Sequence, residues 1–151
     1  MHRFTMRILL TAIVCGSLLL SAPAAGRETL PGPLSGRVLR VIDGDTLSMR
    51  LRIWIGQNLD INVRIAGIDT PEIHGKCPHE REMAESARLA VEGLIDGRPV
   101  TVSNIRLEKY AGRVLATVET ADGTDIARYL IAKGMARPYQ GRARAGWCGN
   151  D

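Results

Sequence analysis

Aromatic residues are scarce in this sequence: three tyrosines, two tryptophans and one phenylalanine make up 4% of its 151 residues. A surface that binds nucleic acid by stacking many bases on a row of aromatic rings is therefore not expected. The chain also lacks internal repeats and low-complexity segments, and its length is that of one domain. We therefore expect one globular unit rather than a repeat array.

The first 27 residues contain no acidic residue. They carry Arg3 and Arg7, then an apolar run of 13 residues over 8–20, then Ala22-Pro23-Ala24. This order is typical of a secretory signal peptide, which we place at residues 1–24. The alternative is a retained membrane anchor, but a spanning helix needs about 20 apolar residues. We therefore expect an exported protein, periplasmic or secreted, with no stable membrane anchor after cleavage.

Cysteine is rare as well, with three in the chain. Cys15 lies in the leader, so the mature chain would keep Cys77 and Cys148. Export permits a disulfide, and an even count fits one, so we predict a bond between these two residues. The alternative is two unpaired thiols that pack in the interior.

Apolar periodicity predicts five strands and two helices. The strands are expected over residues 36–42, 46–55, 61–68, 100–107 and 114–119, and the helices from 78 to the stop at Gly97 and over 125–133. Five short strands avoid exposed edges by closing into a barrel, and a helix between strands three and four is typical of the oligonucleotide-binding (OB) fold. The prediction is an α+β protein, a five-stranded OB-fold barrel of order β-β-β-α-β-β-α. It occupies residues 36–151 after a linker over 25–35.

The formal net charge is +4, and its distribution is uneven. Between positions 128 and 144 there are five basic residues and no acidic one: Arg128, Lys133, Arg137, Arg142 and Arg144. Such a run is either a solvated face or a surface that attracts polyanions.

Two acidic turns follow predicted strands. The first contains Asp43, Gly44 and Asp45, and the second contains Asp69 and Glu72. Either one alone reads as an ordinary turn. Together, the carboxylates of Asp45, Asp69 and Glu72 would form a site of hard oxygen ligands suited to calcium or magnesium.

Three motifs give the chain a family resemblance. They are Ile42-Asp43-Gly44-Asp45-Thr46, then Arg64 five residues before Asp69-Thr70-Pro71-Glu72, then Lys109-Tyr110 followed by Gly112-Arg113. In this order and spacing the chain resembles the staphylococcal nuclease family over about residues 37–139. The resemblance implies an OB-fold barrel of the staphylococcal nuclease type and hydrolysis of phosphodiester bonds in DNA and RNA. We expect the protein to act as a monomer.

The resemblance also implies the site residues. Asp45 and Asp69 match the family's calcium ligands, and Thr70 matches the residue that adds a backbone carbonyl. Glu72 matches the glutamate beside the attacking water. Arg64 and Arg113 match the two arginines that bind the scissile phosphate. The substrate-binding positions are those of Lys109, Tyr110 and Tyr139.

The chain departs from the family pattern at two places. The segment 109–113 is one residue longer than expected, so Arg113 reaches the site if Gly112 allows a bulge or longer turn. The family's last long helix is missing after Tyr139, and the predicted disulfide would fasten the tail instead. Two alternatives to an enzyme stay open, a catalytically silent nucleic-acid- or protein-binding barrel and a structural envelope protein. The retained acidic residues favour the enzyme.

Overall fold

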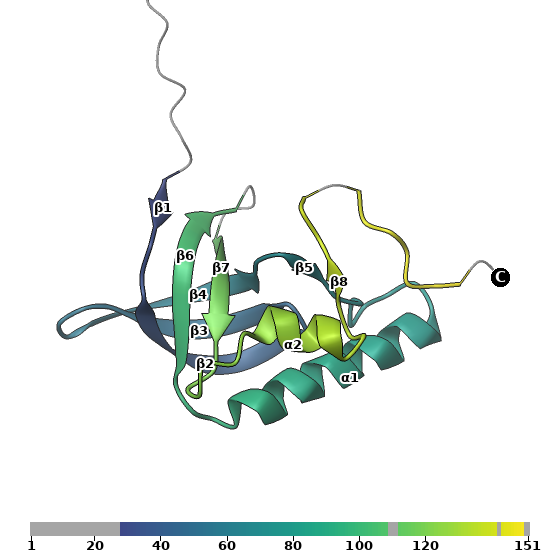
Figure 1. Cartoon of the computed structure of the whole chain (residues 1–151), viewed down its shortest axis with the longest axis horizontal. Coiled ribbons are helices and arrows are strands. Elements are labelled where there is room, and N and C mark those ends of the chain that lie inside the picture. Colours follow the sequence, from purple (N-terminus) through teal and green to yellow (C-terminus); the bar gives the residue numbers. More distant parts are fainter. Residues whose placement is uncertain (1–27, 109–111, 142, 150–151) are drawn as a thin grey trace, which may run out of the picture.

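The computed structural model describes residues 28–108, 112–141 and 143–149 and shows a small barrel with two helices (Figure 1). The predicted signal peptide, Lys109 and Tyr110 lie outside the described residues. The barrel strands are β2 (Leu34–Asp43), β3 (Thr46–Trp54), β4 (Gln57–Ile65), β6 (Val100–Leu107) and β7 (Arg113–Glu119). The helices are α1 (Pro78–Ile95) and α2 (Ile126–Ala132).

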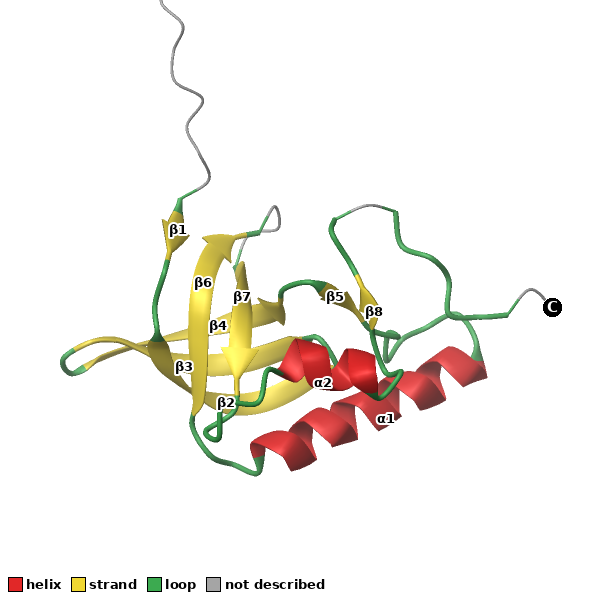
Figure 2. Cartoon of the chain, in the orientation of Figure 1, coloured by secondary structure: helices red, strands yellow, loops and turns green. Residues whose placement is uncertain are grey.

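The five long strands form a closed barrel. Neighbours in the sheet run in the order β6-β2-β3-β4-β7, and an additional β6–β7 pairing closes the circle. The β4–β7 pair is parallel, and the other four pairs are antiparallel. The colouring by secondary structure shows the barrel strands on one side and the helices on the other (Figure 2). The predicted five-stranded barrel and its element order are confirmed.

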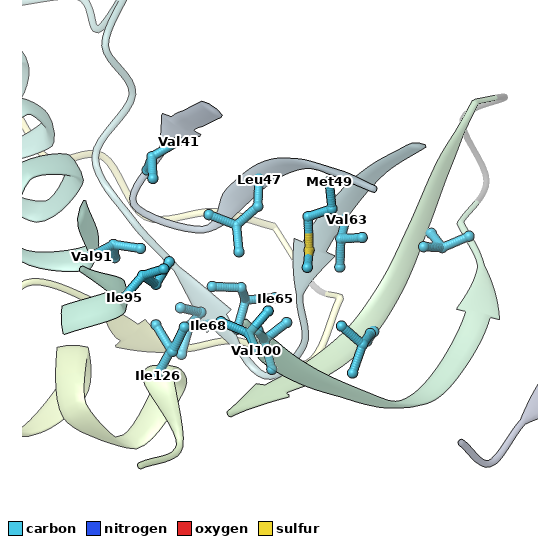
Figure 3. Close-up of a cluster of buried hydrophobic side chains, with 14 of the residues drawn as sticks. Val41, Leu47, Met49, Val63, Ile65, Ile68, Val91, Ile95, Val100 and Ile126 are labelled. Carbon is cyan, nitrogen blue, oxygen red and sulfur yellow. The ribbon is translucent and has the colours of Figure 1, made fainter. Parts of the chain in front are cut away.

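The core fills the barrel and continues under the helices. Leu47, Met49 and Val63 point inward from β3 and β4, as their spacing of two residues requires, and are fully buried. Val91 and Ile95 of α1 and Ile126 of α2 belong to the same cluster (Figure 3). The helices therefore cover one end of the barrel and fix the loops that leave it.

Helix α1 begins and ends where the sequence predicts. Pro78 lies in its first turn, and Asp96 ends it in a left-handed conformation that is followed by Gly97. The residue before the helix, Cys77, is its N-cap, and its Sγ accepts a hydrogen bond from the amide of Glu80 at 3.4 Å. The predicted disulfide therefore starts at the N-terminus of this helix.

Three short strands were not predicted. The segment treated as a linker over 25–35 contains β1 (Thr29–Leu30), which pairs with β6, and the first residues of β2. The predicted strand 61–68 is divided into β4 and β5 (Ile68–Asp69), and β5 pairs with β8 (Arg137–Pro138). Two residues are too few to show an alternating pattern, so these strands depend on tertiary pairing.

Within the described residues, no helix is both long enough and apolar enough to span a membrane.

Candidate functional site

Asp45 lies in the tight turn between β2 and β3. A side chain at Gly44 would place its Cβ 2.8 Å from the Cβ of Ala87 and 3.0 Å from the Cγ2 of Thr70, so glycine is required for this close packing. The carbonyl of Asp45 accepts a hydrogen bond from the amide of Ile65 at 2.7 Å. The turn is therefore packed against α1 and attached to the end of β4, and Asp45 is buried.

Both oxygens of the Asp45 carboxylate accept hydrogen bonds. Its Oδ1 accepts hydrogen bonds from Arg64 Nη1 and from Thr46 Oγ1, both at 2.8 Å. Its Oδ2 accepts one from the amide of Thr70 at 3.2 Å. Because Thr46 and Arg64 are register partners on β3 and β4, the sheet itself places the guanidinium beside the turn.

Asp69, at the end of β5, is the second buried carboxylate. Its Oδ1 lies 3.6 Å from Arg64 Nη2 and 3.1 Å from Arg144 Nε, but neither contact has hydrogen-bond geometry. Its Oδ2 accepts a long hydrogen bond of 3.4 Å from the indole of Trp147. Burial raises the pKa of the Asp69 carboxyl, and the nearby Arg144 guanidinium opposes part of that rise.

The charged groups alternate in sign across the site. Arg64 joins Asp45 to Asp69, and Arg144 joins Asp69 to Glu72 through an ion pair between Arg144 Nη1 and Glu72 Oε1. The three predicted carboxylates therefore lie along one chain of five groups, separated by guanidiniums. A cavity of about 420 Å³ is lined by Asp69, Glu72 and Arg144.

Asp43 ties the two acidic turns together. Its Oδ1 accepts a hydrogen bond from the amide of Ile73 at 3.3 Å, which connects the end of β2 to the loop after Glu72. Burial raises the pKa of the Asp43 carboxyl, and the Ile73 amide opposes that rise. The role of Asp43 is thus to hold the loop that carries Glu72.

Arg113 is the first residue of β7. Gly112 has φ of +80°, a conformation that glycine adopts readily, and Arg113 pairs in register with Asn62, two residues from Arg64 on β4. The Arg113 Nε forms an ion pair with Glu108 Oε2. Arg113 therefore lies beside Arg64's strand with its charge shared by a carboxylate.

Tyr139 lies on the same side of the molecule. Its amide donates a hydrogen bond to the carbonyl of Gly67 at 2.8 Å. Together with Arg64 and Glu108 it lines a second cavity, of about 680 Å³. Arg64 thus opens to this cavity although its side chain is only 5% exposed.

Comparison with known proteins connects this geometry to a family. The sequence model described as staphylococcal nuclease homologue matches residues 62–146, more than half of the chain, including Arg64, Asp69, Glu72 and Arg144. The chain belongs to the staphylococcal nuclease homologue family.

Curated relatives of this staphylococcal nuclease homologue differ in name. An uncharacterized endonuclease of Escherichia coli is 27% identical over 107 residues, which cover 71% of this chain and 62% of the relative. Protein ParB of Escherichia coli is 28% identical over 153 aligned positions, covering 96% of this chain and 76% of the relative. The succinoglycan biosynthesis protein ExoI of Rhizobium meliloti is 31% identical over 128 positions, which cover 82% of this chain and 59% of the relative. The chain thus spans less than two thirds of the length of the endonuclease it matches.

The predicted disulfide is present in this homologue. Cys77 and Cys148 are bonded, with their Cα atoms 6.0 Å apart and a separation of 71 in sequence. Their sulfurs and a carboxylate oxygen of Glu80 lie within 4.8 Å of one another, but the sulfurs are bonded to each other and are not free thiolates. This cluster is therefore a tether rather than a metal site.

Sequence reasoning missed the part that the tail plays. Arg144 and Trp147 contact Asp69, and Arg137 lies with its guanidinium carbon 3.6 Å from the centre of the Trp147 ring. The signal for Arg144 was the acid-free basic run, which did not distinguish one arginine from another.

Among the described residues, Asp45, Asp69 and Glu72 do not form a group of carboxylates within 4.8 Å of one another, but the site does offer the oxygen atoms that a hard divalent cation needs. Asp45 and Asp69 supply carboxylate oxygens, and the buried Asp69 Oδ1 and Thr70 Oγ1 have no hydrogen-bond partner in the described part of the chain. Buried polar atoms normally have a partner, and oxygen atoms are the ligands that calcium and magnesium prefer.

Proposed function

We propose that this protein hydrolyses phosphodiester bonds in DNA and RNA with Ca²⁺ as its cofactor. The observation that carries the proposal is the alternating chain Asp45–Arg64–Asp69–Arg144–Glu72 beside an open cavity, in a member of the staphylococcal nuclease homologue family. Carboxylates and guanidiniums in such close order match a substrate that is anionic and a cofactor that is cationic.

Asp45 and Asp69 would hold the cation, and the backbone carbonyl of Thr70 would complete the protein's contribution. The bound cation would neutralise charge that develops on the phosphoryl oxygens and polarise the phosphorus. Magnesium is the alternative for the same oxygen ligands, and the two ions differ in size and in how readily they lose water.

Formal charges at the site agree with this assignment. Asp45, Asp69 and Glu72 contribute −3, and Arg64 and Arg144 contribute +2, so the protein groups sum to −1. A divalent cation changes this sum to +1, which one phosphodiester neutralises. For these five groups, a sum that leaves out Asp43, the formal charge is therefore zero with both cofactor and substrate bound.

Arg64 would bind the scissile phosphate. Its guanidinium is fixed by Asp45 and opens to the cavity that Tyr139 also lines. A planar guanidinium can donate two parallel hydrogen bonds to phosphate oxygens, which lysine cannot. Because the side chain is already held in place, little reorganisation is needed when charge builds on the phosphate.

Glu72 would act on the attacking water. A carboxylate that orients a water molecule can accept its proton as the new bond from water oxygen to phosphorus forms. The bond from phosphorus to the leaving oxygen breaks, and that oxygen takes up a proton from solvent. Asp43 supports this role because it holds the loop behind Glu72.

Digestion of DNA and RNA by the purified protein, with calcium, with magnesium and with chelator, tests the proposal. Cleavage that requires calcium is expected. Asp45→Asn should weaken calcium binding, measured by calorimetry, and remove activity, because a buried carboxylate ligand is lost. Asp60→Asn is the matched control, since Asp60 is exposed and pairs with Arg50 away from the site. Equal calcium affinity in Asp45→Asn and the wild type would contradict the ligand assignment.

We also propose that the protein is exported and that residues 1–24 are its signal peptide. The leader pattern and the Cys77–Cys148 disulfide, which suits an oxidising compartment, support this location. N-terminal sequencing of the protein from a fractionated culture tests it. A mature chain that still begins at Met1 in the cytoplasm would contradict it.

A further inference from the structure

The tail after β8 passes over the site and returns to the start of α1. In Figure 1 this segment, coloured yellow, leaves β8, loops away from the barrel and descends to the N-terminal end of α1. Arg144 lies on this segment and contacts both Asp69 and Glu72. One charged side chain of the site therefore comes from outside the barrel.

Several contacts close to Arg144 fasten the tail. Arg137 stacks on the ring of Trp147 at 3.6 Å and donates a hydrogen bond from Nη1 to the carbonyl of Gly146 at 2.9 Å. The Trp147 indole reaches Asp69, and the next residue, Cys148, is bonded to Cys77. Because each contact has one end at Gly146, Trp147 or Cys148, within four residues of Arg144, these contacts restrict where its side chain can reach.

Arg144 retains donors for a further anion. Its Nε faces Asp69 Oδ1 and its Nη1 donates a hydrogen bond to Glu72, whereas Nη2 donates no hydrogen bond to a described residue. Its side chain is 40% exposed and lines the cavity of about 420 Å³, whereas the Arg64 side chain is 5% exposed. Arg144 is thus the more accessible of the two guanidiniums.

We propose that Arg144 binds a substrate phosphate and that the Cys77–Cys148 disulfide holds it in position to do so. The inference rests on the proposed nuclease function and names a residue from the tail as part of its substrate site. Without Arg144 the site loses the more exposed of its two guanidiniums, and with it donors that can bind a phosphate.

Binding measured in chelator separates this role from metal chemistry. The probe is a fluorescently labelled single-stranded DNA oligonucleotide, titrated with the full mature protein at several salt concentrations. Arg144→Ala should weaken binding, and the slope of log affinity against log salt should become shallower by about 0.7, the value for one lost phosphate contact on a single strand. Arg52→Ala is the control, because Arg52 is an exposed arginine on β3, opposite Asn58 and outside the basic run over 128–144. The control should change neither the binding affinity nor the slope of log affinity against log salt.

Cleavage kinetics in calcium provide the second measurement. Arg144→Ala should lower kcat/KM on the order of a hundredfold, as expected for loss of a preorganised charged donor, and Arg144→Lys should recover part of it. Cys148→Ser should show a similar loss, and the double variant Cys148→Ser/Arg144→Ala should lose little more than either alone, since both changes remove the same contact. Thermal melts verify that each variant is folded at the assay temperature.

The outcomes distinguish this inference from the proposed function. Arg144→Ala that binds and cuts like the wild type, or that cuts faster because a blocking side chain has been removed, overturns the role of Arg144 and leaves the nuclease proposal intact. If the losses in kcat/KM from Cys148→Ser and Arg144→Ala add in full in the double variant, the role of the disulfide is overturned. A wild-type protein that neither binds nor cuts nucleic acid overturns both.

Discussion

The barrel side of the site and its tail side are held in place by different kinds of interaction. On the barrel side, Asp45 lies in the turn before β3 and Arg64 lies on β4, and the register of Thr46 with Arg64 brings these two buried residues together. On the tail side, Arg144 lies in a segment without helix or strand, and a disulfide, a stacked arginine and one long hydrogen bond hold it. The barrel side is thus held by sheet register, and the tail side by one covalent bond and a few side-chain contacts.

The difference has an energetic consequence. Asp45 and Arg64 lose their positions only if strands of the barrel separate, and that requires global unfolding. Tail groups have few buried apolar contacts and can detach locally at a much lower cost. Chemical reduction is therefore able to alter one side of the site while the other remains folded, and mutations can separate the two.

Removal of the disulfide should give the largest effect on stability. Cys77→Ser/Cys148→Ser opens a loop with a sequence separation of 71, which the chain-entropy estimate values at about 4 kcal/mol of unfolding free energy. The barrel should still form, because its core does not include either cysteine. Urea denaturation of the variant, with reduced wild-type protein as the matched control, measures the change. Coincident urea midpoints for the oxidised wild type and the variant would show that the tail side is held without the bond.

The barrel side could be predicted from the sequence to a large extent. Asp45 and Asp69 adjoin strands whose alternating pattern is clear, so their turns could be placed at strand ends. Arg64 could be placed by its distance from Asp69 and by the family resemblance. The strands, α1 and the barrel closure follow from periodicity and from the need to pair every edge.

The tail side could be predicted in part. The Cys77–Cys148 bond followed from cysteine counting, but the position of Arg144 depends on that bond and on the two-residue pairing of β8 with β5. Neither leaves a periodic signal near Arg144. The alternation of carboxylates and guanidiniums could not be predicted either, because it includes Arg144 from the tail as well as Arg64 from the barrel.

Arg64→Lys tests the barrel side directly. The charge is retained, but the fork that reaches both Asp45 Oδ1 and the site around Asp69 is lost. We expect kcat on DNA at saturating calcium to fall about a hundredfold, which corresponds to about 3 kcal/mol. Calcium affinity should change less than kcat, because lysine does not remove an oxygen ligand. Turnover near that of the wild type would contradict the binding of the scissile phosphate by Arg64.

Arg113→Lys should give a smaller effect than removal of the disulfide or Arg64→Lys. It shows whether Arg113 contributes to phosphate binding in the same way as Arg64. Arg113 begins β7 beside Asn62, its side chain is 26% exposed, and it forms an ion pair with Glu108. A guanidinium that already shares its charge with a carboxylate must give up part of that pairing to bind phosphate, so its net contribution is reduced.

We therefore expect kcat/KM to fall about tenfold in Arg113→Lys, or about 1.4 kcal/mol of transition-state stabilisation. Glu108→Gln is the matched variant, because it releases Arg113 without changing it and should raise kcat/KM if the pairing restrains the arginine. Steady-state kinetics of both variants and of the double variant on one DNA substrate give the coupling between the two residues. A hundredfold loss in Arg113→Lys would place Arg113 with Arg64 on the scissile phosphate. Wild-type kinetics in both single variants would leave the phosphate to Arg64 and to the tail.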